Sequence, residues 1–113
     1  MNRVNAIITH PVYREYYDRL EELEQDRPFC RHQMTHLLDV ARIAYIRSLE
    51  NSLDLDKEVI YAAAVLHDIG KSLQYEKNVP HEISGVEIAE KILGSLPAEL
   101  EFSAEEMRQI LTA

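Results

Sequence analysis

Residues Ala62 to Lys71 read A-A-A-V-L-H-D-I-G-K, and the interpretation of the whole chain depends on this stretch. It completes an apolar run that begins at Val59, and Gly70 follows the polar pair His67 and Asp68. The alanines in the run, with aspartates before it that can cap a helix, favour a buried helix over a strand. Neighbouring helical residues point about 100° apart, so His67 and Asp68 can share a metal ion only where the helix ends. Gly70 predicts that end.

The His-Asp pair alone leaves two interpretations open. A histidine at a helix C-terminus is common on surfaces, because its charge favours the negative end of the helix dipole. Asp68 argues against this interpretation, since an acid at that end is electrostatically misplaced. A second histidine, His36, decides between them, because it lies in a segment of helical spacing, H-L-L-D-V-A-R-I-A. The apolar residues with that spacing are Met34, Leu37, Leu38, Ala41, Ala44 and Tyr45.

Two motifs together resemble the HD-domain superfamily of metal-dependent phosphohydrolases. The first is H-x3-V-A-x2-A from His36, and the second is A-A-x-L-H-D-I-G-K about thirty residues later. The resemblance runs from Arg27 to Leu93. It implies an all-α helical bundle and a divalent-metal-dependent phosphohydrolase that acts on a nucleotide or another small phosphate ester. The alternative is a non-catalytic module of the same fold that binds metal, nucleotide or a protein partner.

The resemblance also implies roles for individual residues. His36, His67 and Asp68 correspond to metal ligands, and His81 corresponds to a ligand of a second ion that Asp68 would bridge. Imidazole and carboxylate ligands suit Mn²⁺, Fe²⁺, Zn²⁺ or Co²⁺, with Mg²⁺ a further candidate, and do not choose among them. Asp68 and Lys71 are the candidate catalytic residues, because a lysine beside the ligands can bind a phosphate oxygen.

His32 and Arg31 are weaker candidates, for contact with the substrate. His32 lies four residues before His36, so both face the same side of a helix. Each of these assignments has an ordinary structural alternative: an exposed lysine for Lys71, a surface histidine for His32, and a first-turn histidine for His81.

The HD family has one more metal-binding aspartate, well downstream of the His-Asp pair. Asp68 is the last aspartate of this sequence, so we expect a chain that is truncated at its C-terminus and binds a divalent ion modestly or not at all. This absence favours the binding module for the chain by itself. The apolar pattern of its last helix also makes a homo-oligomer plausible.

Composition limits the remaining possibilities. The 113 residues predict one domain, residues 1–113, and 46% hydrophobic residues suffice for one core. A net charge of −8 argues against broad binding to nucleic acid or to an anionic membrane. A single cysteine, Cys30, excludes an internal disulfide. No membrane-length apolar run or signal peptide occurs, so we expect a cytoplasmic protein.

The pattern predicts about five helices and no strand. The first runs from Pro11 to about Asp26, and residues 1–8 show no clear period. The others are predicted at about 29–48, at 57–67 after a cap at Asp54 or Asp56, and at 80–94. The last begins at Ser103, which forms a capping box with Glu106. Tyr13, Tyr16 and Tyr17 of the first helix can contact a ligand, but we favour a packing role.

Overall fold

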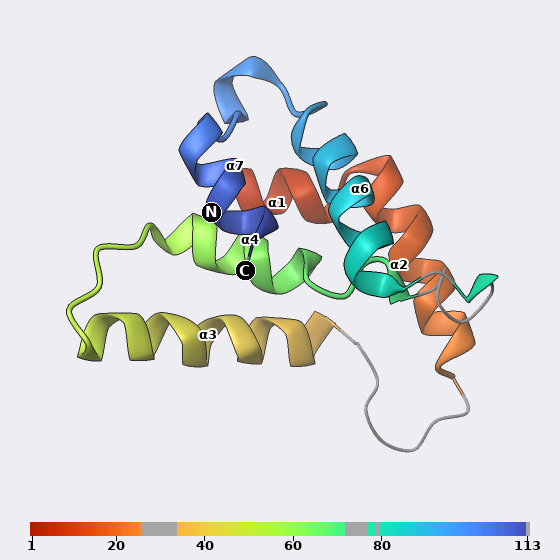
Figure 1. The fold of residues 1–113 in the computed structure, drawn as a ribbon, viewed down its shortest axis with the longest axis horizontal. Coiled ribbons are helices and arrows are strands. Elements are labelled where there is room, and N and C mark those ends of the chain that lie inside the picture. Colours follow the sequence, from red (N-terminus) through yellow and green to blue (C-terminus); the bar gives the residue numbers. More distant parts are fainter. Residues whose placement is uncertain (26–33, 72–76, 79, 113) are drawn as a thin grey trace.

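The protein folds as a bundle of helices in a computed structural model, which describes residues 1–25, 34–71, 77–78 and 80–112, with the backbone alone for residues 81 and 82 (Figure 1). Residues 30–32, which include Cys30, Arg31 and His32, lie outside these ranges. No strand occurs in the described ranges, which confirms the all-α prediction. The elements are α1 (Asn2–Ile8), α2 (Pro11–Leu23), α3 (Met34–Glu50), α4 (Lys57–Leu66), α6 (His81–Leu93), the 3₁₀ helix η1 (Ala98–Leu100) and α7 (Ala104–Leu111).

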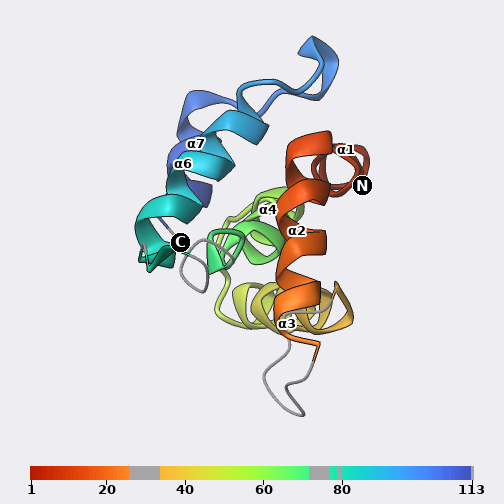
Figure 2. The same cartoon turned by 90° about the vertical axis from the view of Figure 1, so that its right-hand side faces the viewer.

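α4 is the central helix of the molecule. It packs against α1, α3 and α7, and the two views show it enclosed by its neighbours (Figures 1 and 2). Its N-cap is Asp56, whose side chain accepts a hydrogen bond from the amide of Glu58 at 2.8 Å. Six of its ten residues are buried: Val59, Tyr61, Ala62, Ala64, Val65 and Leu66. The apolar run therefore forms the buried helix that the sequence predicts, with one of the two expected aspartates as its cap.

Local capping signals place most of the other boundaries. Pro11 begins α2, and the ring of His10 accepts a hydrogen bond from the amide of Val12. Ser103 and Glu106 form the predicted capping box at the start of α7. α6 ends before Gly94, as predicted. These boundaries follow from hydrogen bonds within a few residues of the chain, which a sequence pattern can show.

The N-terminal helix is a difference from the sequence analysis, which assigns no structure to residues 1–8. α1 buries Val4 and Ile7, which are 2% and 0% exposed. Its Arg3 donates to the carboxylates of Glu58 in α4 and Glu106 in α7. Seven residues are too few to show a helical period or to be stable alone, so tertiary contacts stabilise this helix.

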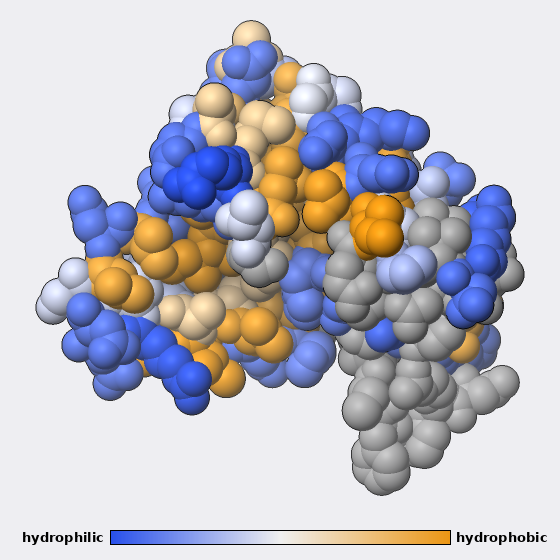
Figure 3. All heavy atoms as spheres, viewed as in Figure 1, coloured by the Kyte–Doolittle hydropathy of each residue, from blue (hydrophilic) through white to orange (hydrophobic). Residues whose placement is uncertain are grey.

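α3 lies at the edge of the bundle and packs mainly against α4. Three large apolar side chains of α3, Ile43, Ile46 and Leu49, are 54%, 54% and 59% exposed. In Figure 3, which has the same view as Figure 1, apolar side chains lie among polar ones in the region of α3, at the bottom of the molecule. Among the described helices, none is both long and apolar enough to cross a membrane.

Candidate metal centre

The end of α4 brings the side chains of His67 and Asp68 together. The helix ends at Leu66, whose carbonyl accepts a hydrogen bond from the amide of Ile69 at 3.1 Å as the chain turns. Nε2 of His67 lies 3.0 Å from Oδ2 of Asp68. The helix therefore ends where the sequence predicts, and the two adjacent side chains can face one ion.

Hydrogen bonds to both ring nitrogens orient His67. Nδ1 donates to the carbonyl of Ala64 at 2.6 Å, and Nε2 lies toward Asp68. The hydrogen bond to the Asp68 carboxylate raises the pKa of His67; burial opposes this rise, and the Ala64 carbonyl adds to it. Histidines that bind metals commonly donate one ring N–H to a backbone carbonyl, which leaves the other nitrogen for the ion. His67 already has this arrangement.

The spacing of the pair fits two ligands of one ion. Ligand atoms about 2.1 Å from an ion, at right angles to each other, lie about 3.0 Å apart. Nε2 of His67 and Oδ2 of Asp68 are 3.0 Å apart. Among the side chains that the structure describes, no group of three His, Cys, Asp or Glu residues could hold a metal ion. The described part of the site therefore supplies two candidate ligand atoms at a separation that one ion could bridge, and an ion would require further ligands.

His36 lies at the same end of the molecule as this pair. α3 runs antiparallel to α4, so its first turn lies beside the end of α4 (Figure 1). His36 is exposed, whereas Leu37 is buried and lines a pocket together with Asp68. His36 thus lies on the surface of the first turn of α3 and, in this structure, forms no group with His67 and Asp68 that could hold an ion, so its role as a ligand stays a prediction.

The start of α6 also packs against the turn after α4. Ser84 donates from Oγ to the carbonyl of Gly70 at 3.1 Å. Gly85 approaches the same residue, since a Cβ atom added to it would lie 3.7 Å from the Gly70 nitrogen. The backbone of His81, the first residue of α6, is therefore within about a helical turn of this contact. Its predicted binding of a second ion remains a prediction.

Lys71 is the third residue after Asp68. Its amide donates to the carbonyl of Asp68 at 3.0 Å, and the residue is partly exposed. Its role in catalysis stays a prediction. The expected substrate contacts of Arg31 and His32 fall outside the described residues.

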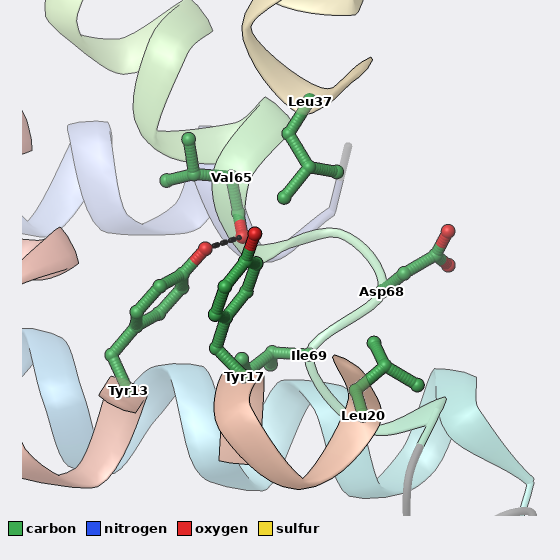
Figure 4. Close-up of a pocket in the computed structure, with 7 residues that line it drawn as sticks. All are labelled: Tyr13, Tyr17, Leu20, Leu37, Val65, Asp68 and Ile69. Carbon is green, nitrogen blue, oxygen red and sulfur yellow. Dashed lines mark hydrogen bonds between the residues drawn. The ribbon is translucent and has the colours of Figure 1, made fainter. Parts of the chain in front are cut away.

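A small apolar cavity lies beside Asp68, between α2 and the end of α4 (Figure 4). Its volume of about 10 Å³ is roughly what one water molecule occupies, which is too little for a phosphate ester. Figure 4 shows the Asp68 carboxylate pointing away from the two tyrosines of the cavity wall. The Asp68 carboxylate is therefore directed away from this cavity. The lining residues are Tyr13, Tyr17, Leu20, Leu37, Val65, Asp68 and Ile69.

Three residues that the sequence analysis does not assign to the site support its backbone. Tyr13 donates to the Val65 carbonyl, Tyr17 accepts from the Met34 amide, and Ser84 donates to Gly70. The partners are 52, 17 and 14 residues apart. No local pattern signals such hydrogen bonds, because they depend on how the helices pack. The burial of Tyr13 and Tyr17 confirms the packing role that the sequence favours.

Comparison with known proteins shows matches over most of the chain. A family model described as HD domain matches residues 34–111. An uncharacterised protein of Clostridium beijerinckii is 54% identical over 93 residues, which cover 82% of this chain and 59% of that protein. No solved structure matches the chain significantly.

More distant relatives are ribonucleases. Ribonuclease Y of Mesoplasma florum is 31% identical over 103 residues, 86% of this chain and 20% of that protein. Ribonuclease Y of Mycoplasma mycoides is 28% identical over 91 residues, 80% of this chain and 21% of that protein. The chain therefore spans about three fifths of the first relative and about one fifth of these two.

Proposed function

The chain belongs to the HD domain family, and from that premise we propose that it is a divalent-metal-dependent phosphohydrolase that acts on a nucleotide or another small phosphate ester. The observation that carries the proposal is the His67–Asp68 pair, whose Nε2 and Oδ2 atoms have the spacing of two ligands of one ion. His36 and His81 complete the proposed ligand set, from the first turns of α3 and α6.

Each residue of the site has a separate role in this proposal. A bound divalent ion would supply Lewis acidity and a hydroxide near neutral pH. The Ala64 carbonyl holds the ring of His67 so that Nε2 is directed toward the ion position. Asp68 holds the ion with its carboxylate and accepts the hydrogen bond of the His67 ring when no ion is bound. Lys71 binds a phosphate oxygen of the substrate and offsets the charge that develops there.

Binding of an ion at Nε2 requires loss of a proton from the imidazolium form of His67. The pKa of His67 is raised, chiefly by Asp68, so protons compete with the ion to a higher pH than at an ordinary histidine. Metal affinity should therefore increase with pH until His67 is neutral.

A second substrate class follows from the relatives named Ribonuclease Y. Hydrolysis of an RNA phosphodiester would need the same chemistry as hydrolysis of a small phosphate ester, an activated water molecule and a polarised phosphate, which a divalent ion held by these residues would supply. The net charge of −8 disfavours a long nucleic-acid footprint, so a short single-stranded RNA is the form to test. The remaining alternative is a module of the same fold that binds metal or nucleotide without turnover.

The test is elemental analysis of the purified chain and of His67→Ala, followed by a hydrolysis screen with Mn²⁺, Co²⁺, Zn²⁺ and Mg²⁺. The substrates are nucleotides, p-nitrophenyl phosphate, its bis ester and a short single-stranded RNA. About one equivalent of metal, lost in His67→Ala, together with metal-dependent turnover, is the expected result. Metal binding without turnover of any substrate favours the binding module. Absence of both in the chain and in its longer relative from Clostridium beijerinckii contradicts the proposal.

A further inference from the structure

We propose that Tyr13 and Tyr17 are positioning residues that fix the backbone at the end of α4, which carries the His67–Asp68 pair, and at the start of α3, which carries His36. This inference rests on the proposed function, since it concerns the same site. It adds to the site a helix, α2, that lies before the residues matched by the family model.

Tyr13 secures the end of α4. Its side chain is fully buried, and its hydroxyl donates to the carbonyl of Val65 at 3.0 Å (Figure 4). Val65 belongs to the last turn of α4, where carbonyl groups lack a partner within the helix. His67 is the second residue after Val65. The tyrosine therefore stabilises the backbone from which His67 and Asp68 project.

Tyr17 secures the start of α3 by the complementary hydrogen bond. Its hydroxyl oxygen accepts from the amide of Met34 at 2.6 Å. Met34 is the first residue of α3, and amides of a first helical turn also lack a partner within the helix. His36 is the second residue after Met34. A side chain of α2 thus serves as a cap for the helix that carries His36.

The two tyrosines act as a unit. They are four residues apart on α2, and their rings stack with centroids 5.8 Å apart and planes inclined by 14°. A shift of α2 would therefore change both hydrogen bonds at once. Burial raises the pKa of both hydroxyls, so each stays protonated over the working pH range.

Packing alone does not account for these hydroxyl groups. Phenylalanine would fill nearly the same volume, and a buried hydroxyl is retained at a cost unless it has a hydrogen-bond partner. Here the two hydroxyls satisfy one carbonyl and one amide, each two residues before a predicted ligand. Their removal leaves both backbone groups without these partners, so the helix ends gain freedom while the core volume is kept.

The test uses Tyr13→Phe, Tyr17→Phe and the double variant, with Tyr16→Phe as the matched control. Tyr16 lies on the same helix, and its hydroxyl makes no hydrogen bond within the part of the chain that the structure describes. Co²⁺ is the probe, because its visible absorption reports the geometry of its ligands. Affinity is measured by titration well below the melting temperature of the weakest variant.

We expect about tenfold weaker Co²⁺ binding in each single variant than in Tyr16→Phe, at the lower end of the range found for residues that orient metal ligands. At saturating Co²⁺, the absorption spectrum of the double variant should also change, which a loss of global stability alone would not cause. Hydrogen exchange should become faster at the first amides of α3 and around residues 67–70.

Three results separate the two proposals. Weaker Co²⁺ binding with a changed spectrum in the tyrosine variants, but not in Tyr16→Phe, supports the positioning role. Unchanged affinity and spectrum, in a chain whose parent binds Co²⁺, overturns the positioning role and leaves the proposed function intact. A parent chain that binds no Co²⁺ contradicts the metal site itself and overturns both.

Discussion

The two ends of α4 differ in how their charged groups are used. At its start, Glu58 accepts two hydrogen bonds from Arg3, from the backbone amide and from Nε, each at 2.9 Å. The Arg3 guanidinium also donates to Glu106 of α7 and lies 4.1 Å from the ring centroid of Phe102. These charges join three helices and are largely satisfied within the protein.

At its other end, hydrogen bonds from neighbouring helices secure the backbone, and the charged pair His67 and Asp68, whose side chains are 36% and 17% exposed, lies at the edge of the core. Tyr13 and Ser84 bind carbonyl groups of the last turn and the following turn. The carboxylate of Asp68 points away from the core, beside the ring of His67 (Figure 4). Ten residues at 1.5 Å each separate the two ends by about 15 Å. One helix thus combines a stabilising end with an end suited to ligand binding, and changes at each end should have separate effects.

The largest expected effect concerns the ligand end. Asp68→Asn replaces a charged ligand by a neutral one, so we expect at least about a hundredfold loss of Mn²⁺ or Co²⁺ affinity. The melting temperature should decrease only modestly compared with this loss of affinity, although the Asp68 side chain is 17% exposed and accepts a hydrogen bond from the His67 ring. Isothermal titration and thermal denaturation measure the two quantities. Asp39→Asn, at a side chain that is 58% exposed, is the control and should bind the metal normally. Equal affinity in both variants would remove Asp68 from the site.

The next effect concerns the stabilising end. Arg3→Met keeps the aliphatic part of the side chain but removes its charge. The ion pairs to Glu58 and Glu106, whose side chains are each 24% exposed, are then lost. We expect the free energy of unfolding to decrease by about 2 kcal/mol, less than for a fully buried pair because water screens these charges in part. Metal affinity should stay within about twofold.

Arg108→Met is the control for this change. The Arg108 side chain is 63% exposed and pairs with Glu105 in the same helix, so water screens the pair and its loss should change the free energy of unfolding far less than the loss of the Arg3 contacts. Urea denaturation measures both variants. Equal losses would show that the Arg3 contacts contribute no more than a surface pair.

A third prediction concerns pH. The hydrogen bond from Arg3 lowers the pKa of Glu106; for Glu58, burial raises the pKa, but the Arg3 interactions outweigh it and the pKa is lowered. Carboxylates with a lowered folded-state pKa contribute stability that is present above the unfolded value of about 4.5 and is lost as pH falls through the folded value.

Stability should therefore decrease below about pH 4.5 in the parent and decrease less steeply in Arg3→Met. Urea denaturation between about pH 7 and pH 3 provides the comparison. Parallel curves for the two proteins would show that Arg3 does not cause the acid sensitivity.

The smallest expected effect tests the packing of α6 against the ligand end. A Cβ atom at Gly85 would meet the Gly70 nitrogen at 3.7 Å, an ordinary contact, so Gly85→Ala should fit and stabilise α6 by about 0.5–1 kcal/mol. At Gly94 a Cβ would lie 3.1 Å from the Glu90 carbonyl oxygen, which is a tight contact. Gly94→Ala should therefore stabilise the protein less than Gly85→Ala, or destabilise it. Thermal denaturation ranks the two variants, and a destabilised Gly85→Ala would mean a tighter approach of α6.

The sequence predicts the features of this protein that depend on neighbouring residues. Asp56 and the Ser103–Glu106 box cap their helices as expected, and Gly70 follows the end of the α4 segment. The pairing of His67 with Asp68 depends on the end of α4, because the side chains of adjacent residues can meet only where the helix ends. These interactions act within one or two helical turns, and a linear pattern can express them.

Other features appear only when the helices are assembled. The helix α1 has no visible period, and Arg3 stabilises it through residues 55 and 103 positions away. The hydrogen bonds of Tyr13 and Tyr17 likewise join α2 to residues 52 and 17 positions away.

Nothing in the sequence around Arg3, Tyr13 and Tyr17 distinguishes them from other arginines and tyrosines. Only the packing of the helices determines which partner each side chain reaches. The sequence by itself therefore determined the helices and the adjacent ligand pair. The tertiary structure decided how that pair is supported, because hydrogen bonds between distant residues depend on the relative positions of whole helices.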